Sequence, residues 1–175
     1  MATIRPARAI RNLKKAYTRV SRSKPRKSYV VGVPYPKIHI FELGNRLGKF
    51  DTVLYLMTTR ALNIRGSALE AARIVSTKHL SKVLGDQNYF FKILVYPHQV
   101  IREHFVAMGA GADRYSQGMA HNFGKPVGIA VRTYANQRMI MLKVNSQNLK
   151  TAKEALKRAS SKLSFVTKVD IQKAA

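Results

Sequence analysis

The sequence predicts an α+β fold, a sandwich in which two helices pack on one side of a mixed β-sheet. Short segments alternate apolar and polar residues as strands do, and two longer segments repeat apolar residues at helical spacing. The chain has 175 residues, 46% of them hydrophobic, enough for one compact core. We therefore expect a single domain over residues 37–175, preceded by a basic extension over 1–36 and containing a long, flexible, glycine-rich loop over 108–127.

The first half of the domain predicts two strands and a helix. Residues 37–42 and 50–58 have the alternating pattern of strands. The run Ser67-Ala-Leu-Glu70 predicts a capping box, in which the Ser67 hydroxyl accepts from the backbone of Glu70 and the Glu70 carboxylate reaches back. The helix that this box opens is expected to end at Gly85, since glycine is the common residue after a helix.

The second half predicts further strands and a second helix. Strands are expected at residues 88–96, 98–106, 127–134, 137–144 and 166–171. Pro97 separates the first two, and Ala135-Asn136 is the expected turn of a hairpin. A helix should begin near Asn148. Its apolar face would hold Leu149, Ala152, Leu156, Ala159 and Leu163, and its other face Lys150, Lys153, Lys157 and Arg158.

The charge of the chain is its most unusual property. Lys and Arg number 32 against 8 Asp and Glu, a formal net charge of +24. A compact protein with this charge repels itself, so a polyanionic partner is expected, with nucleic acid favoured over an anionic membrane. No stretch approaches the roughly 20 apolar residues that span a bilayer, and no signal-peptide core follows the basic start. We expect a cytoplasmic protein that does not bind membranes.

The basic extension is the first candidate site. Residues 1–41 contain eleven basic residues and no acidic one. Arg and Lys pair with phosphates, and Arg and Tyr stack on unpaired bases. A solvated tail without a specific partner is the alternative. The candidate RNA-binding residues are Arg5, Arg8, Arg11, Lys14, Lys15, Tyr17, Arg19, Arg22, Lys24, Arg26 and Lys27.

The glycine-rich loop is the second candidate. Five of the ten glycines lie between Gly109 and Gly128, and glycine lets a backbone approach a ligand closely. The spacing excludes a Rossmann or P-loop nucleotide site, because the third glycine and the GK[ST] sequence are missing. A surface loop without a task is the alternative. The candidate contact residues are Gly111, Asp113, Arg114, Gln117, Gly118, Met119, Gly124 and Lys125.

No pattern of an active site is present. The five histidines have no metal-binding spacing, no serine stands in a nucleophile elbow, and the chain has no cysteine. We therefore expect no enzyme, no metal and no cofactor. An independent RNA or DNA binder, and an RNA-modifying enzyme that holds a cofactor in the glycine-rich loop, remain as alternatives.

A set of motifs occurs in a characteristic order. They are Arg5-Pro-Ala-Arg8, Lys15-Ala-Tyr-Thr-Arg19, Gly32-Val-Pro-Tyr-Pro-Lys-Ile38, Ser67-Ala-Leu-Glu-Ala-Ala-Arg-Ile74, Gly111-Ala-Asp-Arg114 with Gly118-Met119, Phe123-Gly-Lys-Pro126 with Gly128, and Glu154-Ala-Leu-Lys-Arg-Ala159. In this order they resemble the universal large-subunit ribosomal protein family sixteen, in its archaeal and eukaryotic ten-e form. Ala9-Ile10 departs from the family, where an aromatic residue is frequent.

The resemblance implies a role in translation. It implies a structural protein of the large ribosomal subunit that binds large-subunit rRNA beside the aminoacyl-tRNA site and contacts neighbouring ribosomal proteins. The loop over residues 108–127 would extend toward tRNA near the peptidyl-transferase centre, with Arg114, Gln117 and Lys125 as contacts. No homo-oligomer is expected.

Overall fold

A computed structural model of the chain describes residues 6–12, 32–107 and 109–173. The strands form a five-stranded sheet of order β1-β4-β7-β2-β8 and a three-stranded sheet of order β3-β6-β5. Their bounds are β1 Glu42–Gly44, β2 Thr52–Thr58, β3 Leu62–Arg65, β4 Tyr89–Ile93, β5 Gln99–Glu103, β6 Lys125–Thr133, β7 Arg138–Val144 and β8 Thr167–Lys173.

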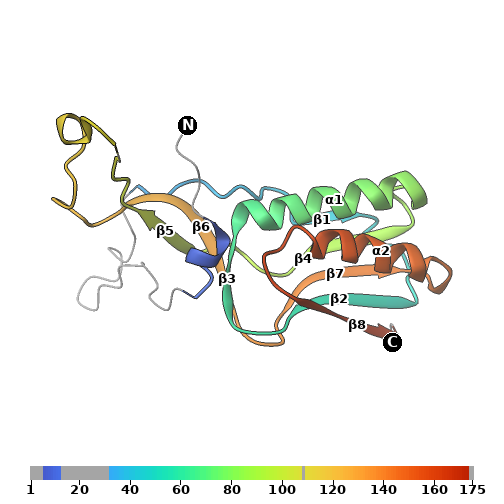
Figure 1. Cartoon of the computed structure of the whole chain (residues 1–175). Coiled ribbons are helices and arrows are strands. Elements are labelled where there is room, and N and C mark those ends of the chain that lie inside the picture. The colour runs from blue at the N-terminus through green and yellow to red at the C-terminus, as the bar shows by residue number, and fades with distance from the viewer. Residues whose placement is uncertain (1–5, 13–31, 108, 174–175) are drawn as a thin grey trace, which may run out of the picture.

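Two α-helices lie side by side on one face of the five-stranded sheet (Figure 1). They are α1 (Gly66–Leu84) and α2 (Leu149–Ser160), and short 3-10 turns occur at η1 (Ala7–Ala9), η3 (Ala112–Arg114) and η4 (Ser146–Asn148). The three-stranded sheet lies at one end of this layered body and carries the β5–β6 loop beyond it (Figure 1). No helix in the described residues is both long enough and apolar enough to cross a membrane.

The core fills the space between the helices and the five-stranded sheet. Leu54 and Leu56 of β2, Leu142 of β7 and Leu156 of α2 are fully buried in one cluster. Burial of such side chains stabilises a fold by about 1.5–3 kcal/mol each. On α2 the expected apolar face is confirmed, since Ala152, Leu156 and Ala159 are buried and Leu149 is partly buried against them. Leu163, expected on the same face, is buried in the core but lies beyond the end of the helix.

The predicted α+β class is confirmed, and so is the placement of both helices on one side. The expected mixture of parallel and antiparallel pairs is wrong in detail, because every strand pair of the described residues is antiparallel. Parallel neighbours need a crossover connection on the scale of a helix. Here α1 connects strands of different sheets, β3 and β4, and α2 leads from β7 to β8, which is not its neighbour.

The expected hairpin around Ala135-Asn136 is wrong, although its turn exists. Asn136 has the positive φ of 58° that such a turn needs, but β6 pairs with β3 and β5, whereas β7 pairs with β2 and β4. The end of β2 explains the separation. The Thr58 hydroxyl donates to the Tyr134 carbonyl over 2.6 Å, and the Thr58 amide donates to the Gln137 carbonyl over 3.0 Å.

The first strand is much shorter than predicted. Of residues 37–42 only Glu42 belongs to a strand, although the Phe41 carbonyl still accepts from the Ile93 amide over 2.9 Å. Ile38 nevertheless lies in the core. The pattern also missed β3, a strand of four residues whose Leu62, Asn63 and Ile64 are all buried, so that no alternation marks it.

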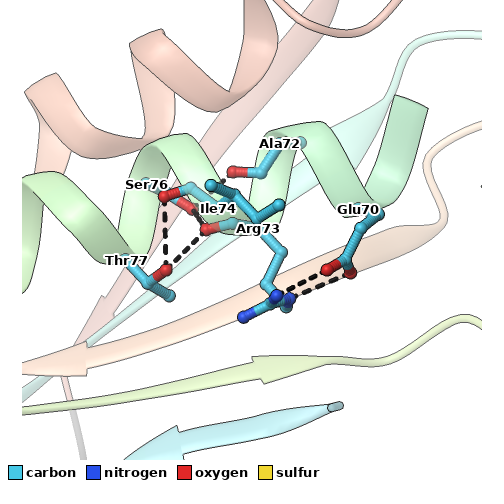
Figure 2. A network of polar contacts seen from close by, with 6 residues as sticks. All are labelled: Glu70, Ala72, Arg73, Ile74, Ser76 and Thr77. Carbon is cyan, nitrogen blue, oxygen red and sulfur yellow. Dashed lines mark hydrogen bonds and ion pairs between the residues drawn. The ribbon is translucent and has the colours of Figure 1, made fainter. Parts of the chain in front are cut away.

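The predicted capping box is wrong, although the helix itself and its end before Gly85 are confirmed. The helix begins at Gly66 with Arg65 as its N-cap, two residues before the expected cap Ser67, and no side chain caps it. Figure 2 shows where the carboxylate of Glu70 goes instead: it accepts from the Arg73 guanidinium, with Nε at 2.9 Å. This ion pair raises the pKa of Arg73, the hydrogen bond to Glu70 being the main cause.

Candidate nucleic-acid interface

The predicted site residues of the extension are only partly within the described chain. Arg8 is exposed on η1, and Arg11 is half-buried just after it. Nine residues lie outside the described residues, so their role stays a prediction: Arg5, Lys14, Lys15, Tyr17, Arg19, Arg22, Lys24, Arg26 and Lys27.

The short described part of the extension is fixed to the three-stranded sheet. Ile10 is buried against Ile101 of β5 and Ala130 of β6. The backbone amide of Asn63 donates to the Arg11 carbonyl over 2.8 Å, and its side-chain amide donates to the Ile10 carbonyl over 3.0 Å. Ile10 is therefore an anchor, and the neighbouring arginines begin the basic segment at a defined place.

The glycine-rich loop leaves β5 and returns into β6. It projects from the end of the molecule opposite to the body of the helices (Figure 1). Gly111 adopts the left-handed conformation at φ 76° and precedes η3, which contains Asp113 and Arg114. A side chain at this φ would be strained, so the glycine permits the turn that exposes Arg114.

Hydrogen bonds at its base tie the two arms of the loop together. The Arg102 guanidinium donates to the Gly124 carbonyl over 2.9 Å. His104 Nε2 lies 2.7 Å from the Gly118 carbonyl, which requires the tautomer with hydrogen on Nε2. The Ser116 hydroxyl accepts from the amides of Ala107, at 3.3 Å, and Gly118, at 3.4 Å. These contacts position the loop relative to the sheet.

The outer surface of the loop carries charge and apolar groups together. Five predicted contact residues are exposed: Asp113, Arg114, Gln117, Met119 and Lys125. Sequence reasoning did not select Tyr115 and Phe123, whose side chains are 73% and 67% exposed. The Arg102 guanidinium lies 4.6 Å from the centre of the Phe123 ring. The sequence signal that could have identified these two residues is the presence of aromatic side chains in a glycine-rich segment, which does not contribute to a core.

The remaining predicted glycines have distinct structural tasks. Gly118 has a φ of 56° and supplies the carbonyl that His104 contacts. At Gly124 a Cβ would stand 2.9 Å from backbone atoms of Glu103. The absence of a side chain therefore allows the returning arm to lie directly against β5.

The outer face of α2 is a third basic surface. As predicted, Lys150, Lys153, Lys157 and Arg158 are exposed, opposite to the buried face. Lysines at this spacing line one side of a helix and repel each other. A phosphate backbone along the helix would relieve this repulsion.

The few acidic groups are largely used within the fold. Lys92 Nζ lies 2.6 Å from the Glu42 carboxylate across the β1–β4 pair. The hydrogen bond from Lys92 is the main reason that the pKa of Glu42 lies below its usual value. Glu70 is paired with Arg73 in the same way. Carboxylates held by particular cations leave the positive charge of the extension, the loop and α2 largely uncompensated.

The arrangement has no features of a catalytic centre within the residues that the structure describes. They contain no group of three or more His, Asp or Glu side chains able to hold a metal ion. What they contain are separate cationic surfaces and a projecting loop with exposed rings. Such a combination is typical of proteins that bind nucleic acid by charge and shape.

The comparisons with known proteins define the family. The model of the family "Ribosomal protein L16p/L10e" matches residues 15–170. The chain is 47% identical over 146 residues to the large ribosomal subunit protein uL16 of Hyperthermus butylicus, covering 83% of this chain and 81% of that one. It is 41% identical over 169 residues to that of Archaeoglobus fulgidus, covering 97% and 93%. The chain belongs to the L16p/L10e family of ribosomal proteins, a structural and not an enzymatic family.

Proposed function

We propose that this protein is a structural constituent of the large ribosomal subunit, in the cytoplasm, where it binds large-subunit rRNA and helps organise the aminoacyl-tRNA site. The observation that carries the proposal is its membership of the family, since the relatives are named for that subunit. The charge of +24 supports it, because phosphate groups are the natural counterions of such a surface.

The basic extension and the face of α2 are the proposed rRNA contacts. Phosphate contacts position a protein on RNA, and together they dominate affinity. Arg8 and Arg11 start the extension at the three-stranded sheet, where Ile10 is anchored. From there the other basic residues of the segment would follow the rRNA, and neighbouring ribosomal proteins would complete the environment.

The glycine-rich loop is the proposed tRNA-proximal element. Its two arms are joined by Arg102 and His104, and it presents Arg114 and Lys125 to solvent. Cations can meet the phosphates of tRNA, and exposed rings can stack on unpaired bases. In this mechanism the protein supplies charge and shape near the peptidyl-transferase centre, and the chemistry belongs to the RNA.

Sedimentation of a native lysate tests the proposed location. The protein should move with large subunits and whole ribosomes through a sucrose gradient, at low and at moderately high salt. Recovery mainly in light fractions would contradict the proposal and would favour an independent RNA or DNA binder.

Truncation tests the proposed contribution of the extension. Neutralising about ten phosphates predicts a slope of log affinity against log salt near −9 on a regular duplex, and a shallower slope on irregular RNA. Deletion of residues 1–28 should weaken binding to a large-subunit rRNA transcript and make the slope shallower. Replacing Lys150, Lys153 and Lys157 by alanine removes three positive charges from α2, so this variant tests the contribution of that helix to rRNA binding separately. Unchanged affinity and slope after the deletion would refute the role of the extension.

A further inference from the structure

A hollow of about 410 Å³ opens on the three-stranded sheet, beside the segment 34–37. This volume lies within the range of roughly 300–1,000 Å³ that is usual for small-ligand pockets. Ile101 of β5 and Gly128 of β6 are direct partners in the ladder, so they share a face of the sheet, and both line the hollow. A Cβ at Gly128 would meet nothing within 4 Å. The missing side chain of Gly128 thus keeps this space open.

A carboxylate lines the hollow. Glu103 follows Ile101 on the same face of β5, and the residue as a whole is only 5% exposed. No hydrogen bond or ion pair to its carboxylate is found within the described chain. Its oxygens are nevertheless not among the fully buried side-chain atoms that lack a partner, so they reach the solvent of the hollow. The Glu103 carboxylate can therefore accept hydrogen bonds from a ligand in the hollow that carries donors.

Two exposed aromatic rings belong to the same lining. Tyr35 is 90% exposed and Phe105 is 55% exposed, and both border the hollow. Their exposed faces give a flat ligand surfaces on which to stack. A planar ring with N–H groups at one edge fits both the aromatic side chains and the carboxylate.

The charge around the hollow identifies the ligand further. Lys37 and Arg65 also line it, and the whole chain carries a net charge of +24. Cations beside the hollow repel an arginine or lysine side chain of a neighbouring protein, which would otherwise suit the carboxylate. A nucleotide suits both the cations and the carboxylate, because its phosphate is anionic and its base carries N–H donors.

We propose that this hollow binds an unpaired guanine nucleotide of RNA, with Glu103 reading the base, Tyr35 and Phe105 stacking on it, and Lys37 meeting its phosphate. The proposal rests on the proposed binding of rRNA and adds a base-specific site to it. Guanine is the base whose N1–H and N2–H point from one edge, and a carboxylate accepts both with its two oxygens. Adenine and uracil lack this pair of donors.

Short RNAs with full-length protein provide the test. The probes are three uridine pentamers whose central nucleotide is guanosine, inosine or adenosine. Inosine lacks only the 2-amino group, so it removes one of the two donors. Wild-type protein should bind the guanosine pentamer at least about fivefold more tightly than the others, since a bidentate pair discriminates by roughly this factor or more.

Two variants test the hollow by different means. Glu103→Gln replaces one acceptor oxygen by an amide donor, and Gly128→Val fills the space without a change of charge. Each should bring the three affinities close together. Asp51→Asn is the matched control, because Asp51 is exposed, lies outside the lining and makes the same change of charge. Thermal melting shows that each variant is folded, and if one variant does not fold the other decides.

The outcomes separate this site from the general function. Equal affinity of wild-type protein for the three pentamers, or none for any, would overturn the site. The site would also be overturned if either folded variant still preferred the guanosine pentamer. Tighter binding of an arginine-containing peptide than of all three pentamers would overturn it as well. Binding of wild-type protein to a large-subunit rRNA transcript is measured in parallel. Failure there would overturn the proposed function, whereas transcript binding without discrimination would overturn the guanine site alone.

Discussion

The Arg102 guanidinium donates to the carbonyl of Gly124 over 2.9 Å and so joins the two arms of the glycine-rich loop where they leave the sheet. The same guanidinium lies over the ring of Phe123. A single side chain of β5 thus holds two consecutive residues of the returning arm. This contact adds to the β5–β6 ladder, which ends at the Glu103–Lys125 pair, in setting the direction of the loop.

Arg102→Ala should loosen the loop and leave the core intact. A hydrogen bond contributes about 1 kcal/mol and an exposed cation–π contact about 0.5–1 kcal/mol. We expect amide hydrogen exchange over residues 109–123 to accelerate about tenfold, with little change in melting temperature. Arg132→Ala, an exposed arginine on β6, is the matched control. Unchanged exchange in the loop of Arg102→Ala would show that other contacts position it.

Gly124→Ala should destabilise the protein by about 1–3 kcal/mol, as overpacking does in a close contact. The added Cβ would stand 2.9 Å from the backbone of Glu103, which has no flexible end that could move away. Gly128→Ala is the control, since its Cβ meets nothing within 4 Å. Denaturant unfolding measures both variants. Equal stability of the two would mean that the arm moves without cost.

Arg114→Ala should leave incorporation into large subunits largely intact and weaken tRNA binding or translation. Arg114 is exposed on η3, in the loop that projects from the end of the molecule opposite to the helices (Figure 1). Reconstituted subunits allow both quantities to be measured on the same particles. Arg60→Ala removes an exposed arginine of the body and controls for charge. Lost incorporation together with normal tRNA binding in assembled particles would contradict this division of tasks.

The Glu42–Lys92 pair should make stability depend on acid pH. The hydrogen bond from Lys92 lowers the pKa of Glu42 in the folded state below the ordinary value of 4.5. Its stabilising contribution is therefore complete above that value and is lost as the pH falls through the lower, folded-state pKa. Melting temperatures of wild-type protein and Glu42→Gln should differ at neutral pH and converge as the pH falls below that lowered pKa. A difference in melting temperature that does not change with pH would show that Glu42 stabilises the fold by packing and not by its charge.

The helices could be predicted from the sequence because their signals are local. Gly85 ends α1 with a φ of 74°, and the apolar spacing of α2 defines its buried face without knowledge of any partner. The start of α1 was misread, because Arg73 competes for the carboxylate that a capping box requires.

Strand partners depend on contacts far apart in the chain. Nothing near Ala135-Asn136 indicates that Thr58, more than 70 residues away, bonds to that turn. The anchoring of Ile10 is hidden in the same way, because a single apolar residue in a basic segment has no periodicity. Of the candidate site, charge and glycine content predicted the surfaces, whereas the exposure of Tyr115 and Phe123 required the fold.

The order of the strands has a consequence for synthesis. β2 lies between β7 and β8, so the strand at residues 52–58 finds its two neighbours only in residues 138–144 and 167–173. While the chain is still growing, the apolar strand containing Leu54 and Leu56 has neither of these partners. Closing so long a connection costs entropy that no local contact compensates. The five-stranded sheet of this protein can therefore close only after residues 167–173 have been synthesised.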